Sequence, residues 1–346
     1  MNRLKVGLVF GGRSGEHEVS IRSAKSIYDA LDKNKYQVFL AGIDKTGGWH
    51  VVEPKWLPGG AEMKSLPNGE NHLRIEEQKA DVIFPIVHGT YGEDGCLQGL
   101  LEILDVAYVG AGVLGSAVGM DKDIQKRLLM QAGIKTAEYL VINSADDLNK
   151  IKVKKYPVFV KPASMGSSVG VSKVSSLQTL NASIKKALKY DRKALVEEFI
   201  EGREIEVAVL DGKASIPGEV IPKGHEFYDY EAKYIDENGA ELRIPAKLKK
   251  ALVSKIQQIA EKVFNILECE GMARVDMFLK KSGEVIVNEI NTLPGFTNIS
   301  MYPRLWEASG LSYSKLLDRL IEIAIKRQRE KMKLVRSYNQ DGDARI

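Results

Sequence analysis

MARVDMFLKKSGEVIVNEIN, residues 272–291, contains two alternating strand patterns around a polar turn and predicts a β-hairpin. With the turn centred on residues 281–284, Asp276 lies opposite Glu289 on the neighbouring strand. Two carboxylates that face each other in this way lie about 5 Å apart at their Cβ atoms and repel. A soluble protein has little reason to keep such a pair without a cation between them, so the hairpin predicts a cation site.

The same register places Arg274 opposite Asn291, on the face that carries both acids. Asp276, Glu289 and Asn291 offer only oxygen ligands, which suit Mg²⁺ or Mn²⁺ better than zinc. The alternative is a solvated strand face on which Arg274 neutralises one acid. Three apolar residues are expected on this face: Met272, Phe278 and Val287. They argue against full exposure and favour the metal interpretation.

A second segment, VFVKPASMGSSVGVSKV at residues 158–174, places a loop of small residues between two expected strands, 158–161 and 169–174. Successive N–H groups and hydroxyls of such a loop can bind phosphate oxygens, and Lys161 adds positive charge. The spacing of a Walker A motif occurs nowhere in the chain. A Gly/Ser hairpin alone is more often an ordinary turn. Beside a Mg²⁺ site, however, it favours a nucleoside triphosphate as ligand.

Two further segments are ambiguous on composition alone. VEEFIEGREIEVAVL, residues 196–210, alternates acids with apolar residues; its acids could accept hydrogen bonds from adenine and ribose or simply face solvent. NTLPGFTNISMYP, residues 291–303, follows the predicted ligands directly. Gly295 can bring a backbone N–H close to a reacting group, and Ser300 offers a hydroxyl. Taken alone, however, this segment is equally typical of an ordinary loop.

The first hundred residues have the pattern of an open parallel sheet. Strands are expected at residues 4–10, 36–43 and 80–87, with a helix after the first. Ligands of such sheets bind at the carboxyl ends of the strands. Two conspicuous motifs follow strands there, GGRSGEHEVS at 11–20 and HGTYGEDG at 88–95.

The rest of the chain has a different, mixed α+β pattern. A helix is expected over residues 122–131, a strand over 138–142, and a helix from Ser144 to about Lys152. Residues 247–268 have the apolar stripe of an amphipathic helix.

Composition excludes several classes of protein. The 346 residues are 44% hydrophobic and 28% charged, as in globular proteins of two or three lobes. The chain lacks an apolar run long enough for a membrane span and lacks the pattern of a signal peptide, so we expect a cytoplasmic protein. Cys96 and Cys269 are too few for a disulfide framework or a zinc site, and both are expected to be small core residues.

The net charge of +4 raises the question of nucleic-acid binding. Residues 326–336 contain six Lys or Arg and one Glu, which accounts for the excess. We therefore expect the excess to lie in a solvated C-terminal helix end, where cations suit the helix dipole, with no nucleic-acid partner.

Eight motifs together resemble the D-alanine–D-alanine ligases of the ATP-grasp superfamily, in the order of that family and over nearly the whole chain to about residue 325. They are GGRSGEHEVS, HGTYGEDG, GMDKDIQK, FVKPASMGSSVGVSKV, VEEFIEGREIEV, YDYEAKY, ARVDMF and VNEINTLPGFTNISMYP. Each motif is moderately specific, and the ordered set is very specific.

The resemblance implies an ATP-grasp fold with an N-terminal Rossmann-like lobe (1–118), a central lobe (119–196), a C-terminal lobe with the metal site (197–330) and a basic, polar tail (331–346). It implies ATP-dependent joining of two D-alanine molecules through an acyl phosphate, for peptidoglycan precursor synthesis. ATP is the co-substrate, two Mg²⁺ or Mn²⁺ ions assist, and a homodimer is expected.

The resemblance also implies roles for individual residues. For ATP these are Lys122, Lys161, Ser167, Ser168, Glu197, Glu198 and Glu204. The metal ligands are Asp276, Glu289 and Asn291. The first D-alanine is bound by Glu16, which forms a hydrogen-bonded set with Ser167 and Tyr234, and lies near His88. Arg274 and the Gly295 N–H form the oxyanion site, and Lys233, Ser300 and Met301 belong to the second D-alanine site.

Three other functions are weighed against the joining of two D-alanine molecules. Relatives that form D-alanyl-D-lactate lack the Lys-Tyr pair that this chain has at Lys233 and Tyr234. Relatives that form D-alanyl-D-serine tend to have arginine where this chain has Met301. A catalytically inactive ATP-grasp binding protein would have no need of the facing acids.

Overall fold

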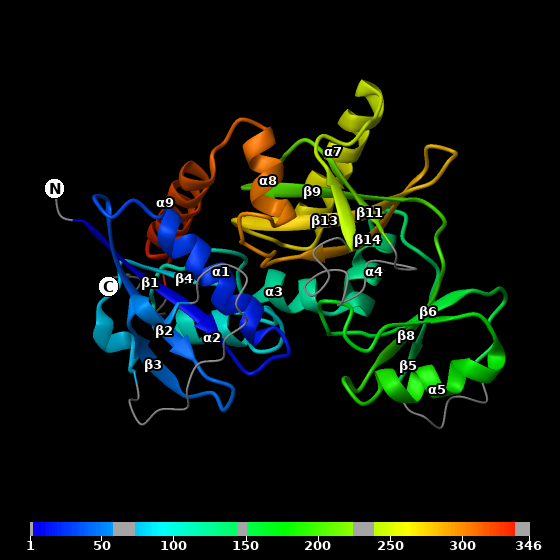
Figure 1. The fold of residues 1–346 in the computed structure, drawn as a ribbon, viewed down its shortest axis with the longest axis horizontal. Coiled ribbons are helices and arrows are strands. Elements are labelled where there is room, and N and C mark those ends of the chain that lie inside the picture. The colour runs from blue at the N-terminus through cyan, green and yellow to red at the C-terminus, as the bar shows by residue number, and fades with distance from the viewer. Residues whose placement is uncertain (1–2, 58–72, 144–150, 224–238, 336–346) are drawn as a thin grey trace, which may run out of the picture.

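The computed structural model describes residues 3–57, 73–143, 151–223 and 239–335. Its strands form three sheets (Figure 1). The first sheet lies at one end of the molecule, the second lies at the other end, and the third lies between them. Parallel pairing in the first sheet and antiparallel pairing in the other two confirm the predicted mixture of α/β and α+β lobes.

The first sheet has the strand order β3-β2-β1-β4, in which β1 is parallel to β2 and β4 as predicted. An antiparallel edge strand, β3, was not predicted. It forms because Asp44 accepts hydrogen bonds from the N–H groups of Thr46 and Gly48, which turn the chain back. The elements of this lobe are β1 (Leu4–Gly11), α1 (His17–Ala30), β2 (Tyr36–Ile43), β3 (Trp49–Val52), β4 (Val82–Pro85) and α2 (Cys96–Ile103), with short 3₁₀ helices at Pro54–Trp56 and Ile75–Gln78.

The second sheet is antiparallel and has the order β5-β8-β6-β7, with α5 packed against it. Its strands are β5 (Tyr139–Ile142), β6 (Val158–Pro162), β7 (Ser172–Val174) and β8 (Ala194–Glu198); α5 is Leu177–Ala187. The pairing of β6 with β7 confirms the predicted hairpin. The strand β7 begins later than predicted, because Ser167, Ser168 and Gly170 have positive φ and form the loop instead. Of the helix predicted from Ser144, residues 144–150 lie outside the described residues, and residues 151–152 are not helical.

The third sheet has the path β12-β11-β9-β13-β14, with β10 also paired to β9. Its strands are β9 (Arg203–Leu210), β10 (Lys213–Ala214), β11 (Gly218–Pro222), β12 (Ala240–Arg243), β13 (Met272–Leu279) and β14 (Val285–Asn291). The predicted amphipathic helix is α7 (Lys250–Ile266), which buries Ile256, Val263 and Phe264 against β9 and β13. Two helices between the first and second sheets, α3 (Val113–Met120) and α4 (Lys122–Gln131), also contact this lobe; the predicted bounds of α4 are confirmed.

The hairpin β13–β14 has both predicted pairs at its open end: Asp276 with Glu289, and Arg274 with Asn291. A bulge after Asp276 shifts the register by one residue toward the turn, where Met277 pairs with Val287. The prediction that Val287 shares the face of the acids is therefore wrong. Val287 is buried with Met277 in the core beneath α7.

The last two helices, α8 (Met301–Ala308) and α9 (Tyr313–Lys331), join the first and third lobes in one continuous core. Arg327 on α9 donates to the carbonyl oxygens of Tyr108 and Gly110 at 2.7 Å and pairs with Glu270. Lys331 pairs with Glu102. The basic segment is therefore partly a structural contact, and the expectation of a merely solvated helix end is wrong for these residues.

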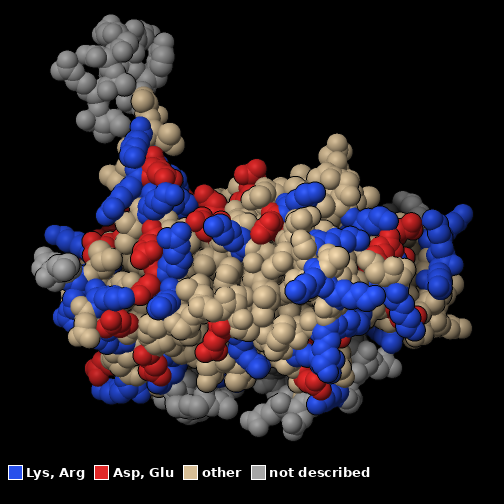
Figure 2. Space-filling model, turned by 90° about the horizontal axis from the view of Figure 1, so that it is seen from above, with Lys and Arg blue, Asp and Glu red and all other residues tan. Residues whose placement is uncertain are grey.

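Positive charge is also not confined to the C-terminal segment. Residues 151–195 contain ten Lys or Arg and one Asp. Figure 2 shows Lys and Arg gathered at the end of the molecule that carries α5 and the second sheet in Figure 1. The net charge of the folded body is small only because acidic residues elsewhere offset this lobe.

Two remaining expectations concern cysteines and membranes. Cys269 is buried as expected, but Cys96 at the start of α2 is exposed, which corrects its assignment to the core. No helix in the described part of the chain is both long and apolar enough to cross a bilayer.

Candidate functional site

A cavity of about 410 Å³ lies between the second and third sheets. Most of the predicted nucleotide and metal residues line it: Lys122, Lys161, Ser167, Ser168, Glu197, Glu198, Glu204, Asp276 and Glu289. The rest of the lining is largely apolar and includes Phe159, Val171, Phe199, Val220, Ile221 and Phe278. A cavity with both kinds of wall suits a ligand that has a flat apolar part and a charged part.

Arg274 is the centre of charge beside this cavity. Its guanidinium donates to both carboxylate oxygens of Asp276 at 2.7 Å, and its Nε lies 3.0 Å from Glu206 Oε2. Glu206 on β9 is paired with Asp276 on the side opposite Glu289, so acids from three adjacent strands meet here. Burial opposes the charge on Arg274, but Asp276 and Glu206 raise the pKa of its guanidinium well above the ordinary value.

Sequence reasoning missed Glu206, which is 3% exposed. The alternation of acids in REIEV, residues 203–207, places Glu204 and Glu206 on one face of β9 and could have indicated it. What the sequence did not reveal is that β9 pairs with β13 and brings Glu206 beside Asp276.

The facing acids have partners in the structure. Asn291 donates to Asp276 Oδ2 at 2.9 Å, and Lys122 Nζ lies 3.2 Å from Glu289 Oε2. Asp276 is therefore neutralised by Arg274, as in the alternative to a metal site given above. The repulsion between Asp276 and Glu289 alone does not require a metal ion. The described residues also hold no group of three or more His, Cys, Asp or Glu that could bind a metal without other ligands. Asp276, Glu289 and Asn291 still present oxygen atoms from adjacent strands, as Mg²⁺ requires.

Lysines and a buried glutamate line the part of the cavity formed by the second sheet. Lys161 Nζ on β6 lies 2.8 Å from Glu197 Oε2 on β8. Burial opposes the charge on both groups, but Glu197 raises the pKa of Lys161, and Lys126 and Lys161 together lower the pKa of Glu197. Lys122 at the start of α4 donates to the Met165 carbonyl at 2.8 Å, and so contacts the Gly/Ser loop.

The Gly/Ser loop also contacts the first lobe. Ser167 Oγ donates to Glu16 Oε1, which confirms that the two residues lie together. A Cβ placed on Gly166 would lie 3.0 Å from Glu16 Oε2, and one placed on Gly89 would lie 2.8 Å from the same oxygen. Sequence reasoning missed these two glycines, which let the backbone enclose the Glu16 carboxylate.

His88 is buried beside the first lobe's β4. Its Nε2 lies 3.0 Å from Ser23 Oγ, and its Nδ1 lies 3.1 Å from the Leu293 carbonyl and 3.3 Å from Glu93. Burial opposes its charge, but the hydrogen bond with Glu93 and the nearby carboxylates raise the pKa of His88 above the ordinary value. The loop after β14 thus meets the first lobe at His88.

The other predicted residues fall into three groups. Gly295 and Ser300 lie together, because a Cβ on Gly295 would be 3.0 Å from Ser300 Oγ. Met301 is 5% exposed and packs in the core with Leu305, so its side chain does not line the cavity. Lys233 and Tyr234 lie outside the described residues.

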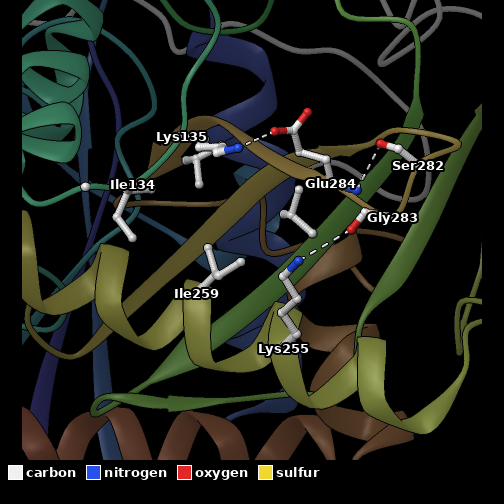
Figure 3. A pocket seen from close by; sticks show the side chains of 10 residues that line it. Ile134, Lys135, Lys255, Ile259, Ser282, Gly283 and Glu284 are labelled. Atoms are coloured by element: carbon white, nitrogen blue, oxygen red, sulfur yellow. Dashed lines mark hydrogen bonds and ion pairs between the residues drawn. The ribbon is translucent and has the colours of Figure 1, made fainter.

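A larger hollow, of about 600 Å³, lies on the other side of the β13–β14 hairpin (Figure 3). Lys135 and Lys255 reach the turn at 282–284 from two sides, where Lys135 pairs with Glu284 and Lys255 approaches the Gly283 carbonyl. None of the predicted site residues lines it. At this hollow the Val287 N–H donates to the Lys135 carbonyl at 2.8 Å. This hydrogen bond connects β14 to the segment that precedes β5.

Comparisons with known proteins agree with this arrangement. Family models described as D-ala D-ala ligase N-terminus and C-terminus match residues 5–111 and 128–322. The chain is 50% identical to the D-alanine–D-alanine ligase of Oceanobacillus iheyensis (98% of this chain, 99% of the relative) and 48% identical to D-alanine–D-alanine ligase A of Escherichia coli K12 (94% and 97%).

Solved structures give the same result. The D-alanine-D-alanine ligase of Coxiella burnetii superposes with a TM-score of 0.83 at 39% identity, over 97% of this chain and 98% of that one. The VanG D-Ala:D-Ser ligase of Enterococcus faecalis superposes with a TM-score of 0.80 at 33% identity, over 93% and 100%.

We predict that Arg274→Met destabilises the fold by about 3 kcal/mol at pH 7, because it leaves the buried carboxylates of Asp276 and Glu206 without the cation that they share. The folded variant would then bind protons more readily than its unfolded chain, so its deficit relative to wild type is present at pH 7 and shrinks as the pH falls toward 5. Urea unfolding at several pH values measures this difference.

The matched control is Arg203→Met. Arg203 also binds a carboxylate with two nitrogens, but its partner Glu219 keeps Arg243 at 3.4 Å. We expect a smaller loss with little change between pH 7 and pH 5. If the loss of unfolding free energy in Arg274→Met did not depend on pH, it would contradict the conclusion that Arg274 compensates the charge of neighbouring carboxylates.

Proposed function

The chain belongs to the D-alanine–D-alanine ligase family, an ATP-dependent class, and we propose that it joins two D-alanine molecules into D-alanyl-D-alanine. ADP and phosphate are the other products. The observation that carries the proposal is the cavity between the two antiparallel sheets, where lysines, facing acids and an apolar wall meet beside the Glu16–Ser167 contact. The same assignment gives the chain its place in peptidoglycan precursor synthesis.

ATP occupies the cavity in this proposal. The apolar wall takes the adenine, Glu197, Glu198 and Glu204 serve its amino group and the ribose hydroxyls, and the Gly/Ser loop with Ser167 and Ser168 covers the phosphates. Lys122 and Lys161 offset the phosphate charge. Both lysines are already paired with carboxylates, so phosphate binding exchanges one anion for another instead of requiring new buried charge.

Asp276, Glu289 and Asn291 would hold two Mg²⁺ or Mn²⁺ ions. Their oxygen donors and their adjacent positions on β13 and β14 fit this role. When bound, the ions would neutralise phosphate oxygens during transfer. The residues themselves orient the polyphosphate and keep the negative charge of the site in balance with Arg274 and Lys122.

The first half of the reaction needs a bound D-alanine whose carboxylate points at the γ-phosphate. Glu16 binds its ammonium group, and Ser167 and Tyr234 complete that set. The D-alanine carboxylate attacks the γ-phosphorus, the bond to the ADP oxygen breaks, and an acyl phosphate forms. His88, with its raised pKa, adds positive charge next to the transferred phosphoryl group.

The second half forms the peptide bond. The amine of a second D-alanine attacks the acyl carbon, Arg274 and the Gly295 N–H stabilise the tetrahedral oxyanion, and phosphate leaves. Lys233 and Ser300 hold the second carboxylate. The acyl phosphate must be protected from water, and residues 222–240 are the segment proposed to cover it.

We further propose the lobe boundaries 1–118, 119–196, 197–330 and a tail at 331–346, a cytoplasmic location and a homodimer. The second substrate is D-alanine and not D-serine or D-lactate. One structural neighbour is a D-Ala:D-Ser ligase at 33% identity, whereas the relatives at 48% and 50% identity are D-alanine–D-alanine ligases. The presence of Lys233, Tyr234 and Met301 favours the same substrate.

The direct test is ADP formation with D-alanine, L-alanine, D-lactate and D-serine, each assayed side by side with product analysis. We expect ADP and D-alanyl-D-alanine with D-alanine alone, and no mixed product when D-lactate or D-serine competes at neutral pH. Formation of D-alanyl-D-lactate or D-alanyl-D-serine would contradict the assignment of D-alanine as the second substrate. ATP binding without any D-alanine-dependent ADP would identify an inactive binding protein.

The second test concerns Glu16. We predict that Glu16→Gln raises the KM for the first D-alanine by about tenfold or more, because the neutral amide loses a charge-assisted bond to the ammonium group, while ADP binding stays within about twofold. Steady-state kinetics and calorimetry measure the two effects.

Glu18→Gln is the control, since Glu18 lies in the first turn of α1, which begins directly after the N-cap Glu16, and pairs with Lys45. We expect wild-type kinetics from it. Equal effects of both substitutions on the KM for D-alanine would show that Glu16 does not contact the substrate.

A further inference from the structure

Lys126 on α4 is a buried cation that the proposed reaction does not use. Its exposure is 0%, and it is among the largest fully buried side chains of the described residues. Lys126 does not line the nucleotide cavity, although its neighbour one turn earlier, Lys122, does. A lysine is almost never fully buried unless it is paired, so its partner indicates its role.

That partner is Glu197. Lys126 Nζ donates to Glu197 Oε1 at 3.2 Å, from behind the cavity wall, and lies 5.6 Å from the centre of the Tyr139 ring. Glu197 Oε2 faces the other lysine, Lys161, at 2.8 Å. Glu197 is itself only 3% exposed.

The two lysines differ in what they can reach. Lys161 lines the cavity and so can turn to a bound phosphate, whereas Lys126 is fully buried and forms its ion pair with Glu197. Lys161 is the partner of Glu197 Oε2, at 2.8 Å, whereas Lys126 donates to Oε1. Oε2 is itself buried, so it can accept a hydrogen bond from a ligand once Lys161 has turned to the phosphates.

We propose that Lys126 is a positioning residue, the permanent counter-ion that holds the Glu197 carboxylate toward the nucleotide base while Lys161 moves to the phosphates. This inference rests on the nucleotide-binding part of the proposed function, in which Glu197 accepts from the adenine amino group, and does not depend on the ligation step.

The physical reason is the cost of a buried carboxylate without a cation. If Lys126 were absent, Glu197 would depend on Lys161 alone, and Lys161 would have to leave a buried anion in order to bind phosphate. Burial lowers the pKa of Lys126, and the charge of Glu197 opposes that effect more than any other group does. With Lys126 in place, Lys161 exchanges partners without exposing Glu197 to that cost.

The experiment is a double-mutant cycle on nucleotide binding. We expect Lys126→Met to weaken ADP binding and to raise the KM for ATP about tenfold, with the KM for D-alanine within about twofold of wild type. We also expect a smaller preference for ATP over ITP, which lacks the amino group. In a Glu197→Gln background, Lys126→Met should have almost no further effect, because its partner charge is already gone.

Arg127→Met is the matched control on the same helix. Arg127 is exposed and pairs with Asp123, which keeps Lys193 as a second partner, so we expect unchanged ADP binding. Lys126→Gln, whose amide can still donate to Oε1, should fold and show a smaller loss than Lys126→Met.

Three results would overturn the proposal. They are wild-type ADP affinity and ATP preference in Lys126→Met, an undiminished effect in the Glu197→Gln background, and loss of the thermal unfolding transition in both Lys126 variants, which would make the residue purely structural. Because calorimetry with ADP needs no turnover, absence of ligase activity with this binding pattern would refute the proposed function and leave the inference standing.

Discussion

The contact between Arg274 and the carboxylates of Asp276 and Glu206 is the interaction on which the site depends. Three adjacent strands, β9, β13 and β14, each bring an acid to one small region, and a folded protein tolerates that concentration of negative charge only with a cation inside it. Arg274 supplies two parallel hydrogen bonds to Asp276 and still reaches Glu206. Asp276 is thereby held at the cavity wall, where Asn291 donates to the same carboxylate.

The same principle extends across the lobes. Lys122 on α4 reaches Glu289 on β14, Lys161 and Lys126 share Glu197, and Ser167 of the Gly/Ser loop reaches Glu16 of the first lobe. Each contact joins elements that are far apart in sequence. The lysines of the cavity are therefore already paired with carboxylates, and in the proposed function an anionic ligand would replace those carboxylates as their partners.

Much of this could be predicted from the sequence, because the strongest signals are local. The hairpin register, the helix over 122–131, the parallel first sheet and the Gly/Ser loop all follow from periodicity and turn residues. Val287 was misplaced because a bulge, which alternation does not reveal, reverses the face of the strand. Glu206 and Lys126 were missed because their importance comes from pairing between distant segments. The contacts of Arg327 could not be predicted because its neighbours in sequence have the pattern of an exposed basic segment.

The most direct measurement is dipeptide formation by the Asp276→Asn variant, together with its unfolding midpoint. Asparagine keeps the size of the side chain and Arg274 keeps Glu206, so the fold should survive, while the site loses one of its two facing carboxylates. We expect a midpoint close to that of wild type and loss of D-alanyl-D-alanine formation. Wild-type turnover at an unchanged midpoint would contradict the claim that the facing acids of β13 and β14 carry the reaction.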